Sequence, residues 1–209
     1  MTTPAERLDA LAPPVPSHIA FLHRGGAELR NYTLEFMRRG LDRPSEALFC
    51  FGEPSVGEHL LRDLERSVGR DLAPEVQAGR IVVGQADSDV DRQLENVIGP
   101  LEAFRANGVS LVRFIGIVAW DVPTFPPPED FLWFESKLNE FIPDFAVIAL
   151  CPYDLADIPA RAIAYGALEA HPFVLSGGVL RRNPQLIAPD RYLRERLLRL
   201  PWLESESPS

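Results

Sequence analysis

The sequence predicts an α/β protein with three layers, in which a mostly parallel β-sheet carries helices on both faces. Short apolar runs of strand length alternate with longer segments whose apolar residues recur at helical spacing, and this alternation repeats five times. The longest apolar run, residues 109–120, lacks polar alternation, as is typical of a central strand covered on both faces. No internal repeat or long linker divides the 209 residues, so we expect one main domain, residues 17–188.

The expected strands are short, apolar and bounded by Gly, Pro or charged residues. In chain order they cover residues 18–23, 46–52, 79–86, 109–120 and 145–153. Residues 171–182 differ, because two short strands flank Ser176-Gly177-Gly178 and form a hairpin. We place this C-terminal antiparallel hairpin at one edge of the sheet.

The expected helices follow the strands and show one apolar stripe each. In chain order they cover residues 27–41, 55–69, 89–107, 128–142, 158–170 and 190–200. Ser55, and either Ser88 or Asp89, are expected N-caps, and Pro128 suits a first helical turn. Leu193, Leu197 and Leu200 share one side of the last helix, so residues 189–209 form an amphipathic helix and tail. The Pro- and Ala-rich residues 1–16 are expected to be a flexible leader.

Composition excludes several classes of protein. The formal charge is −9 and Lys and Arg do not cluster, so attraction to nucleic acid or to anionic lipid is not expected. No run approaches the 18 or so apolar residues of a membrane span, and the N-terminus is not a signal peptide. Cys50 and Cys151 lie inside apolar segments and suit a reducing compartment. We therefore expect a cytoplasmic protein.

Residues 51–60, FGEPSVGEHL, contain the glycine spacing of a phosphate-binding P-loop. The lysine position holds Glu58, whose negative charge would lie beside a polyanion, and the hydroxyl position holds His59, which offers no hydroxyl to magnesium. Gly52 and Gly57 are then expected to release the strand and to sit in the first helical turn. We predict that this stretch does not hydrolyse nucleotides.

Cysteine and histidine leave one chemical alternative open. There is no G-x-S-x-G elbow, and Cys50 stands between two phenylalanines in a strand centre, where burial would mute it. Cys151 is predicted at the carboxyl end of a parallel strand, where ligands bind in open α/β sheets. No histidine pair has metal spacing, so no cofactor is required. A site of His18 and Cys151 would nevertheless suit zinc or another soft metal, with Asp154, Glu135 and His171 as candidates for further ligands.

A ligand crevice is the second expectation. Trp120 ends the central strand, and Tyr153 and Asp154 end the next one. Glu135 and Asn139 are four residues apart and share a helix face. Aromatic walls with a few polar groups would suit a small, largely apolar ligand, although each of these residues also fits a structural role.

These residues also carry a family resemblance. HIAFLH near the start, the Trp that ends a long strand, FESKLNEFIPDFAVIALCPYD and HPFVLSGGVLRRNP together resemble the MEDS domain, a sensory module named for methanogens, methylotrophs and a dichloromethane-responsive repressor. The resemblance runs from about His18 to Pro184. Its more specific half is the second, with E-x-x-x-N, C-x-Y-D, His-Pro, Gly-Gly and Asn-Pro in order. His23 departs from it, because an aromatic residue is common there.

The resemblance implies a RecA-like fold without a working P-loop and a non-catalytic sensor of small hydrocarbon derivatives. It further implies that His18 and Cys151 contact a ligand or metal. The other motif residues that it carries over are Trp120, Glu135, Tyr153, Asp154 and His171. The output is expected to act in trans on a kinase, an anti-sigma factor or a transcription regulator. A homodimer is an alternative that the sequence leaves open.

Two other functions compete with the sensor. One is an enzyme, either a degenerate nucleotide-binding protein or a metal-dependent hydrolase built on His18 and Cys151. The other is a pure interaction module that docks a partner through its acidic surface or its C-terminal leucine face.

Overall fold

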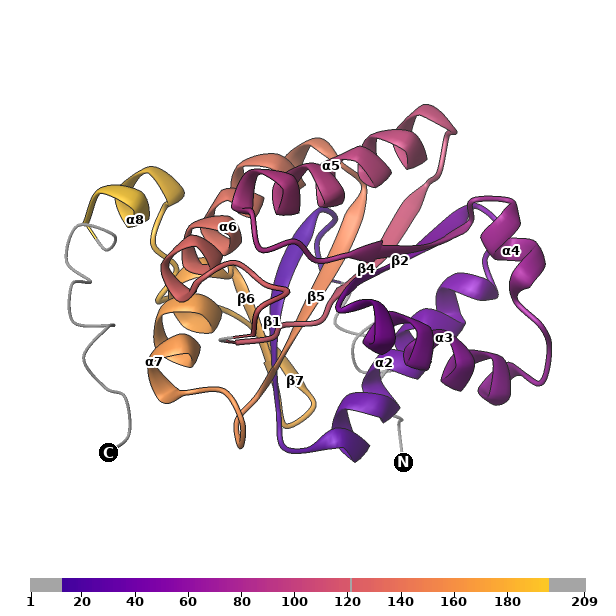
Figure 1. Ribbon diagram of the computed structural model, residues 1–209, viewed down its shortest axis with the longest axis horizontal. Helices are drawn as coiled ribbons and strands as arrows, with labels where there is room; N and C mark the ends of the chain where they lie inside the picture. Colours follow the sequence, from indigo (N-terminus) through magenta and orange to yellow (C-terminus); the bar gives the residue numbers. More distant parts are fainter. Residues whose placement is uncertain (1–12, 121, 196–209) are drawn as a thin grey trace.

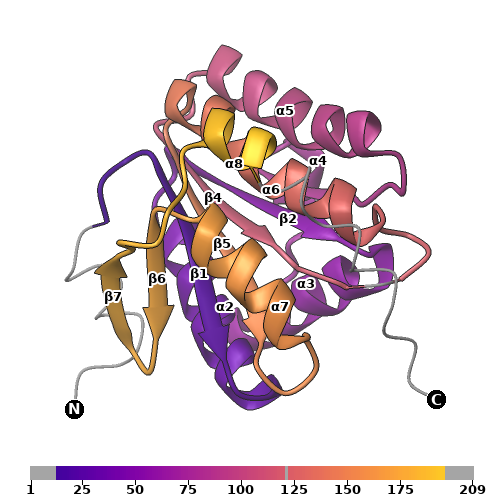
Figure 2. The same cartoon turned by 90° about the vertical axis from the view of Figure 1, so that its left-hand side faces the viewer.

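A computed structural model describes residues 13–120 and 122–195. Seven strands form one sheet in the order β3-β2-β4-β5-β1-β6-β7, parallel except for the antiparallel β6–β7 pair at one edge (Figures 1 and 2). In chain order the strands are β1 Ser17–His23, β2 Glu46–Gly52, β3 Ile81–Gln85, β4 Leu111–Gly116, β5 Val147–Asp154, β6 Phe173–Ser176 and β7 Val179–Arg182. The predicted α/β class and the edge hairpin are confirmed.

Helices cover both faces of the sheet (Figure 1). One face carries α2 Gly26–Leu41 and α3 Pro54–Val68, with the short α4 Ala73–Gln77 at its edge; the other carries α5 Val90–Ala106 and α6 Pro128–Phe141. A 3-10 turn, η1 Ile142–Asp144, precedes β5; α7 Ala160–Ala162 and the π-helix η2 Ile163–Leu168 follow it. The last described helix, α8 Pro189–Glu195, packs against α6 through Tyr192 and Leu132 (Figure 2).

Strand pleating sends alternate side chains of β1 to opposite faces. Ile19 and Phe21 join the apolar core under α2 and α3. His18 and Ala20 therefore point to the other face, beneath α6 and η2, where Ala20 packs with Cys151 and Tyr153 of β5. This face of β1 and β5 positions the candidate site.

Several predicted boundaries need correction. Ser55 does not cap α3, because the helix already begins at Pro54 and Glu53 is its N-cap residue. Asp89 does cap α5, and the helix continues through Pro100. Strand β4 ends at Gly116 rather than at Trp120, since its last pairing partner on β2 is Phe51.

The two glycines of the P-loop-like stretch have packing roles. Gly52 is the last residue of β2, and Gly57 lies in the first turn of α3, as predicted. A Cβ on Gly57 would stand 2.6 Å from Cγ1 of Val83 on β3, so the absence of a side chain lets α3 approach the sheet closely. Helix–strand packing thus accounts for Gly57 without a bound phosphate.

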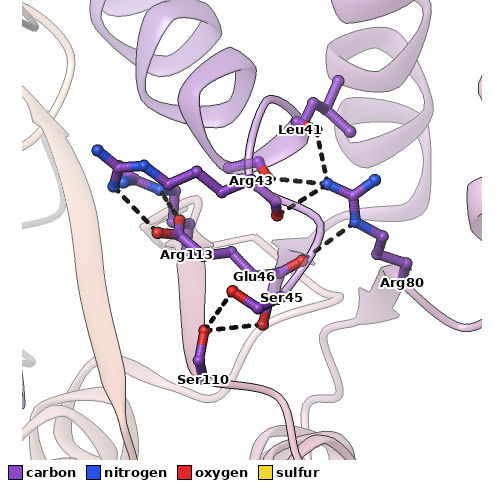
Figure 3. Close-up of polar contacts among 8 residues, drawn as sticks. Leu41, Arg43, Ser45, Glu46, Arg80, Ser110 and Arg113 are labelled. Atoms are coloured by element: carbon purple, nitrogen blue, oxygen red, sulfur yellow. Dashed lines mark hydrogen bonds and ion pairs between the residues drawn. The ribbon is translucent and has the colours of Figure 1, made fainter.

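A buried polar cluster ties β2 and β4 to the loop after α2 (Figure 3). Nε of Arg113 donates to Glu46 across 2.7 Å, and both side chains are more than nine-tenths buried. Arg43 bonds the other oxygen of Glu46 from the surface at 3.0 Å. Arg80 donates to four backbone carbonyls, those of Gly40, Leu41, Arg43 and Glu46, and so satisfies the C-terminal end of α2.

Within the described residues, no helix combines the length and the apolar character needed to cross a membrane. Most of the predicted leader and of the predicted tail, residues 1–12 and 196–209, lies outside the part of the chain that the structure describes. Leu197 and Leu200 of the predicted C-terminal face are among these residues.

Candidate functional site

Four chemically active side chains from four parts of the chain meet beneath helix α6. They are His18 on β1, Glu135 on α6, Cys151 on β5 and His171 just before β6; we call them the tetrad. Each is at most 2% exposed, and one ligand atom from each lies within 4.8 Å of the others. Sequence analysis paired His18 with Cys151 and named Glu135, His171 and Asp154 as further candidates. The structure brings the first two of these into the tetrad and leaves Asp154 outside it.

The sheet register explains the meeting of His18 and Cys151. His18 pairs with Ala149 on the parallel strand β5, so Cys151, two residues further, points to the same face. Cys151 lies in the middle of β5, with three more strand residues after it, rather than at the carboxyl end as predicted. The tetrad is therefore covered by α6 and is not part of the open crevice beyond the strand ends.

Oxygen acceptors orient both histidines. Asn139 donates its amide Nδ2 to the carbonyl of Ala170, so its Oδ1 accepts from Nδ1 of His18 at 3.1 Å. Nδ1 of His171 donates to the carbonyl of Gly166 at 3.0 Å. Because both Nδ1 atoms carry the hydrogen, a neutral ring in each case presents the lone pair of Nε2 to the interior of the tetrad.

The two lone pairs converge on the same carboxylate. Nε2 of His171 lies 3.2 Å and Nε2 of His18 lies 3.4 Å from Oε2 of Glu135. Sγ of Cys151 lies 3.4 Å from Nε2 of His18. Neither Oε2 of Glu135 nor Nε2 of His171 has a hydrogen-bond partner of good geometry among the described residues. Electron-rich atoms thus face one another, an arrangement that calls for a positive charge between them.

Burial and the neighbouring charges set the protonation states. Burial raises the pKa of Glu135, but protonated His171 and His18 imidazoles, which would donate to the carboxylate from Nε2, outweigh it and bring that pKa down to about 2. Burial and the nearby His171 lower the pKa of His18. Burial, with the charge of Glu135, raises the pKa of Cys151 well above its usual range. The site therefore holds a carboxylate and a thiol that stays protonated unless a cation replaces its proton.

The donor set fits a soft divalent metal such as zinc. Two imidazole nitrogens, one sulfur and one carboxylate oxygen are all zinc ligands, and each ring is held through its Nδ1 hydrogen, as metal-bound histidines usually are. Ligands bound tetrahedrally at about 2.0–2.3 Å stand roughly 3.3–3.7 Å apart, and three of the tetrad separations, 3.2–3.4 Å, lie near this range. A divalent cation would also cancel the charges of the carboxylate and the thiolate.

The surroundings of the tetrad are closely packed and mostly apolar. The ring edge of Tyr153 packs against His171, with centroids 5.6 Å apart. Asn183 donates to the carbonyl of His171 at 2.7 Å and fixes the start of β6. A void of about 10 Å³, lined by Phe114, Phe131 and other apolar groups, borders Cys151 and Glu135; it has room for about one water.

A separate crevice lies at the carboxyl ends of β1 and β5. The connections that leave these adjacent strands run to opposite faces of the sheet, which opens a crevice between them. The cavity there has a volume of about 290 Å³, and His23, Trp120 and Asp154 are among its lining residues. Trp120 reaches it from the loop after β4. Tyr153 is fully buried on the tetrad side and does not line the crevice as predicted.

The eight predicted site residues therefore divide into two groups. One group forms or contacts the tetrad and consists of His18, Glu135, Asn139, Cys151, Tyr153 and His171. Trp120 and Asp154 line the crevice. Sequence reasoning missed the π-helix and Asn183; the Asn-Pro pair was the only local signal for the latter.

The chain is similar to known proteins in sequence and in fold. The family model described as "MEthanogen/methylotroph, DcmR Sensory domain", abbreviated MEDS, matches residues 17–172. A search of curated proteins finds no match. Among solved structures, a KaiC-like protein from the hyperthermophilic archaeon Pyrococcus horikoshii OT3 is similar, with a TM-score of 0.50 and 15% identity. The match covers 77% of this chain and 70% of that one, and it shows the RecA-like fold. Because the family model spans most of its length, including the whole tetrad, the chain belongs to the MEDS family of sensory domains.

Proposed function

We propose that this protein is a non-catalytic small-molecule sensory domain of prokaryotic signal transduction, and that the tetrad holds one zinc ion at its sensing centre. The observation that carries the proposal is the convergence of four zinc-type donor atoms within 4.8 Å in a fully buried position. A bound zinc ion would hold four separate elements together and would stabilise the Cys151 thiolate. Family membership supports the sensory role, and the tetrad would supply the metal centre of that sensor.

Ligand binding belongs to the crevice rather than to the tetrad. His18 and His23 lie on the same strand β1, and Cys151 and Asp154 lie on the same strand β5. A small hydrocarbon derivative bound between His23 and Asp154 would therefore act on the two strands that carry half of the tetrad. Ligand binding would then shift the population between two conformational states of the domain. A kinase, an anti-sigma factor or a transcription regulator in the cytoplasm would respond to that shift.

The geometry favours a sensor over a metal-dependent hydrolase. A catalytic zinc site keeps one position open for water or substrate, whereas the tetrad supplies four protein ligands. The adjoining void of about 10 Å³ is too small for a substrate. In the P-loop-like stretch, the packing of Gly57 on Val83 further disfavours a nucleotide site.

Native mass spectrometry of the purified protein tests the proposal. We expect one zinc per chain in the wild type and none in Cys151→Ser. Cys50→Ser is the matched control, because Cys50 is equally buried in a strand but lies in the core on the other face; this variant should retain the metal. Zinc lost from both variants, or absent from a folded wild type that is supplied with zinc, would contradict the proposal. A mass increase with Mg-ATP would support the enzyme alternative.

A further inference from the structure

The crevice contains a buried polar atom that the fold leaves without a partner. His23 is 3% exposed, lines the crevice, and its Nδ1 has no hydrogen-bond partner among the described residues. Oδ2 of Asp154 lies 3.7 Å from this Nδ1, which is beyond hydrogen-bond distance. A buried group in this state calls for a ligand or a water.

One carboxylate oxygen of Asp154 faces Nδ1 of His23 and is not held by the backbone. Its Oδ1 accepts from the backbone N–H of Ala156 at 2.9 Å, which fixes the carboxylate at the end of β5. Oδ2 remains directed toward His23. A single N–H or O–H group placed between Nδ1 of His23 and Oδ2 of Asp154 could therefore contact both atoms.

The charges that line the crevice indicate whether a cationic, neutral or anionic ligand would bind there. Two carboxylates, those of Asp154 and Asp157, are among its described lining residues, and neither lysine nor arginine is. An anionic ligand is disfavoured here, and a cation is favoured over a neutral molecule.

The remaining walls suit an alkyl chain. Trp120, Val122, Leu29 and Ile158 line the crevice with an indole and three aliphatic side chains. An indole face attracts an organic cation through its quadrupole as well as through apolar contact. The volume of about 290 Å³ suits a molecule smaller than most drug-sized ligands.

We infer that the crevice binds a small protonated alkylamine, whose ammonium group lies between His23 and Asp154 and whose alkyl chain packs on Trp120. The inference rests on the proposed function, since it names the chemical class of the sensor's ligand. It assigns His23, the residue that departs from the family pattern, to ligand recognition.

Titration of the full chain with three probes of matched size tests this inference, with binding followed by ¹H–¹⁵N NMR. The probes are n-butylammonium, n-butanol and butyrate. We expect butylammonium to bind at least about tenfold more tightly than butanol, to shift the indole N–H of Trp120, and butyrate not to bind. Asp154→Asn should remove the preference for the amine. Asp144→Asn, an exposed site before the amino end of β5, is the matched control and should keep it.

The comparison of the three probes uses the wild-type protein, so it does not depend on the folding of any variant. Equal binding of butanol and butylammonium, or a preference that survives in Asp154→Asn, would overturn the amine assignment while leaving a crevice ligand in place. Failure of all three probes to shift Trp120 would overturn the crevice as a binding site. Zinc content, measured on the same samples, reports on the tetrad independently of either result.

Discussion

His171 and Tyr192 hydrogen-bond to consecutive carbonyl groups of the same π-helix. Nδ1 of His171 donates to Gly166, and the hydroxyl of Tyr192 donates to Tyr165 at 3.1 Å. The first bond orients a tetrad ligand and the second anchors helix α8. π-helices are rare and are frequent at functional sites. Here η2 joins the tetrad to a C-terminal helix that lies beyond the residues matched by the family model.

Replacing Tyr192 by Phe should lower both the stability of the protein and its affinity for zinc. The carbonyl of Tyr165 would lose a buried donor, so we expect the free energy of unfolding to fall by about 1 kcal/mol. Zinc affinity should fall as well, by less than the roughly 10–100-fold typical of groups that bond a metal ligand directly. Tyr32→Phe, in the core on the other face, is the control and should leave zinc affinity unchanged. A destabilised Tyr192→Phe protein with wild-type zinc affinity would show that η2 does not couple the two.

Two helical glycines should respond differently to alanine. In Gly57→Ala the new Cβ would meet Val83 at 2.6 Å, and overpacking should lower the free energy of unfolding by about 1–3 kcal/mol. In Gly99→Ala, on α5, the new Cβ would meet nothing within 4 Å outside its own helix backbone and chain neighbours. Because Pro100 follows and crowds that Cβ, the gain in helix propensity is offset, and we expect the free energy of unfolding to change by less than about 1 kcal/mol. Urea denaturation of both variants measures the difference. A tolerated Gly57→Ala would remove the packing explanation of the P-loop-like spacing.

The two arginines that bind Glu46 should differ in their contribution to stability. Arg113→Met leaves the buried carboxylate without its buried partner, and we expect a loss of about 3–5 kcal/mol. Arg43→Met removes a guanidinium that is about half exposed, from the same carboxylate, and should cost less than about 1 kcal/mol. Thermal or chemical denaturation at neutral pH distinguishes them. Similar losses in the two variants would mean that burial does not govern this cluster.

His23 should make the protein less stable in weak acid. Burial lowers its pKa below the usual 6.5, against the opposing influence of Asp154, Glu28 and Asp157. Between the lowered pKa and 6.5 the folded state binds fewer protons than the unfolded chain, so the free energy of unfolding falls as the pH falls through this window and is constant above it. His23→Phe should show a shallower decline between pH 7 and pH 5 (about the range in which histidine titrates). Identical pH profiles for the two proteins would argue that His23 is not penalised by burial.

Much of the architecture is visible in the sequence because apolar periodicity reports burial directly. Residues 18–23 and 46–52 were predicted almost to the residue, since every position of β2, and every position of β1 except the partly buried Leu22, is buried. Residues 109–120 were not, because the apolar run continues past Gly116 into a loop whose side chains line the crevice. Periodicity detects apolar surroundings and cannot distinguish a strand from an apolar wall.

The proximity of two site residues could be predicted where both lie on one helix or on two neighbouring strands. His18 with Cys151, and Glu135 with Asn139, are of this kind. The place of His171 depends on the π-helix, whose residues 163–168 have the composition of an ordinary helix. The separation of tetrad and crevice depends on where α6 crosses the sheet, which is a matter of tertiary packing.

Cobalt substitution tests the central claim most directly. After the metal is removed and one equivalent of Co²⁺ is added, tetrahedral binding by the tetrad predicts strong visible absorption bands and a thiolate-to-cobalt charge-transfer band in the near ultraviolet. The charge-transfer band should be absent in Cys151→Ser and present in Cys50→Ser. Weak bands of octahedral cobalt in the wild type, or a charge-transfer band that persists in Cys151→Ser, would contradict a metal centre built from His18, Glu135, Cys151 and His171.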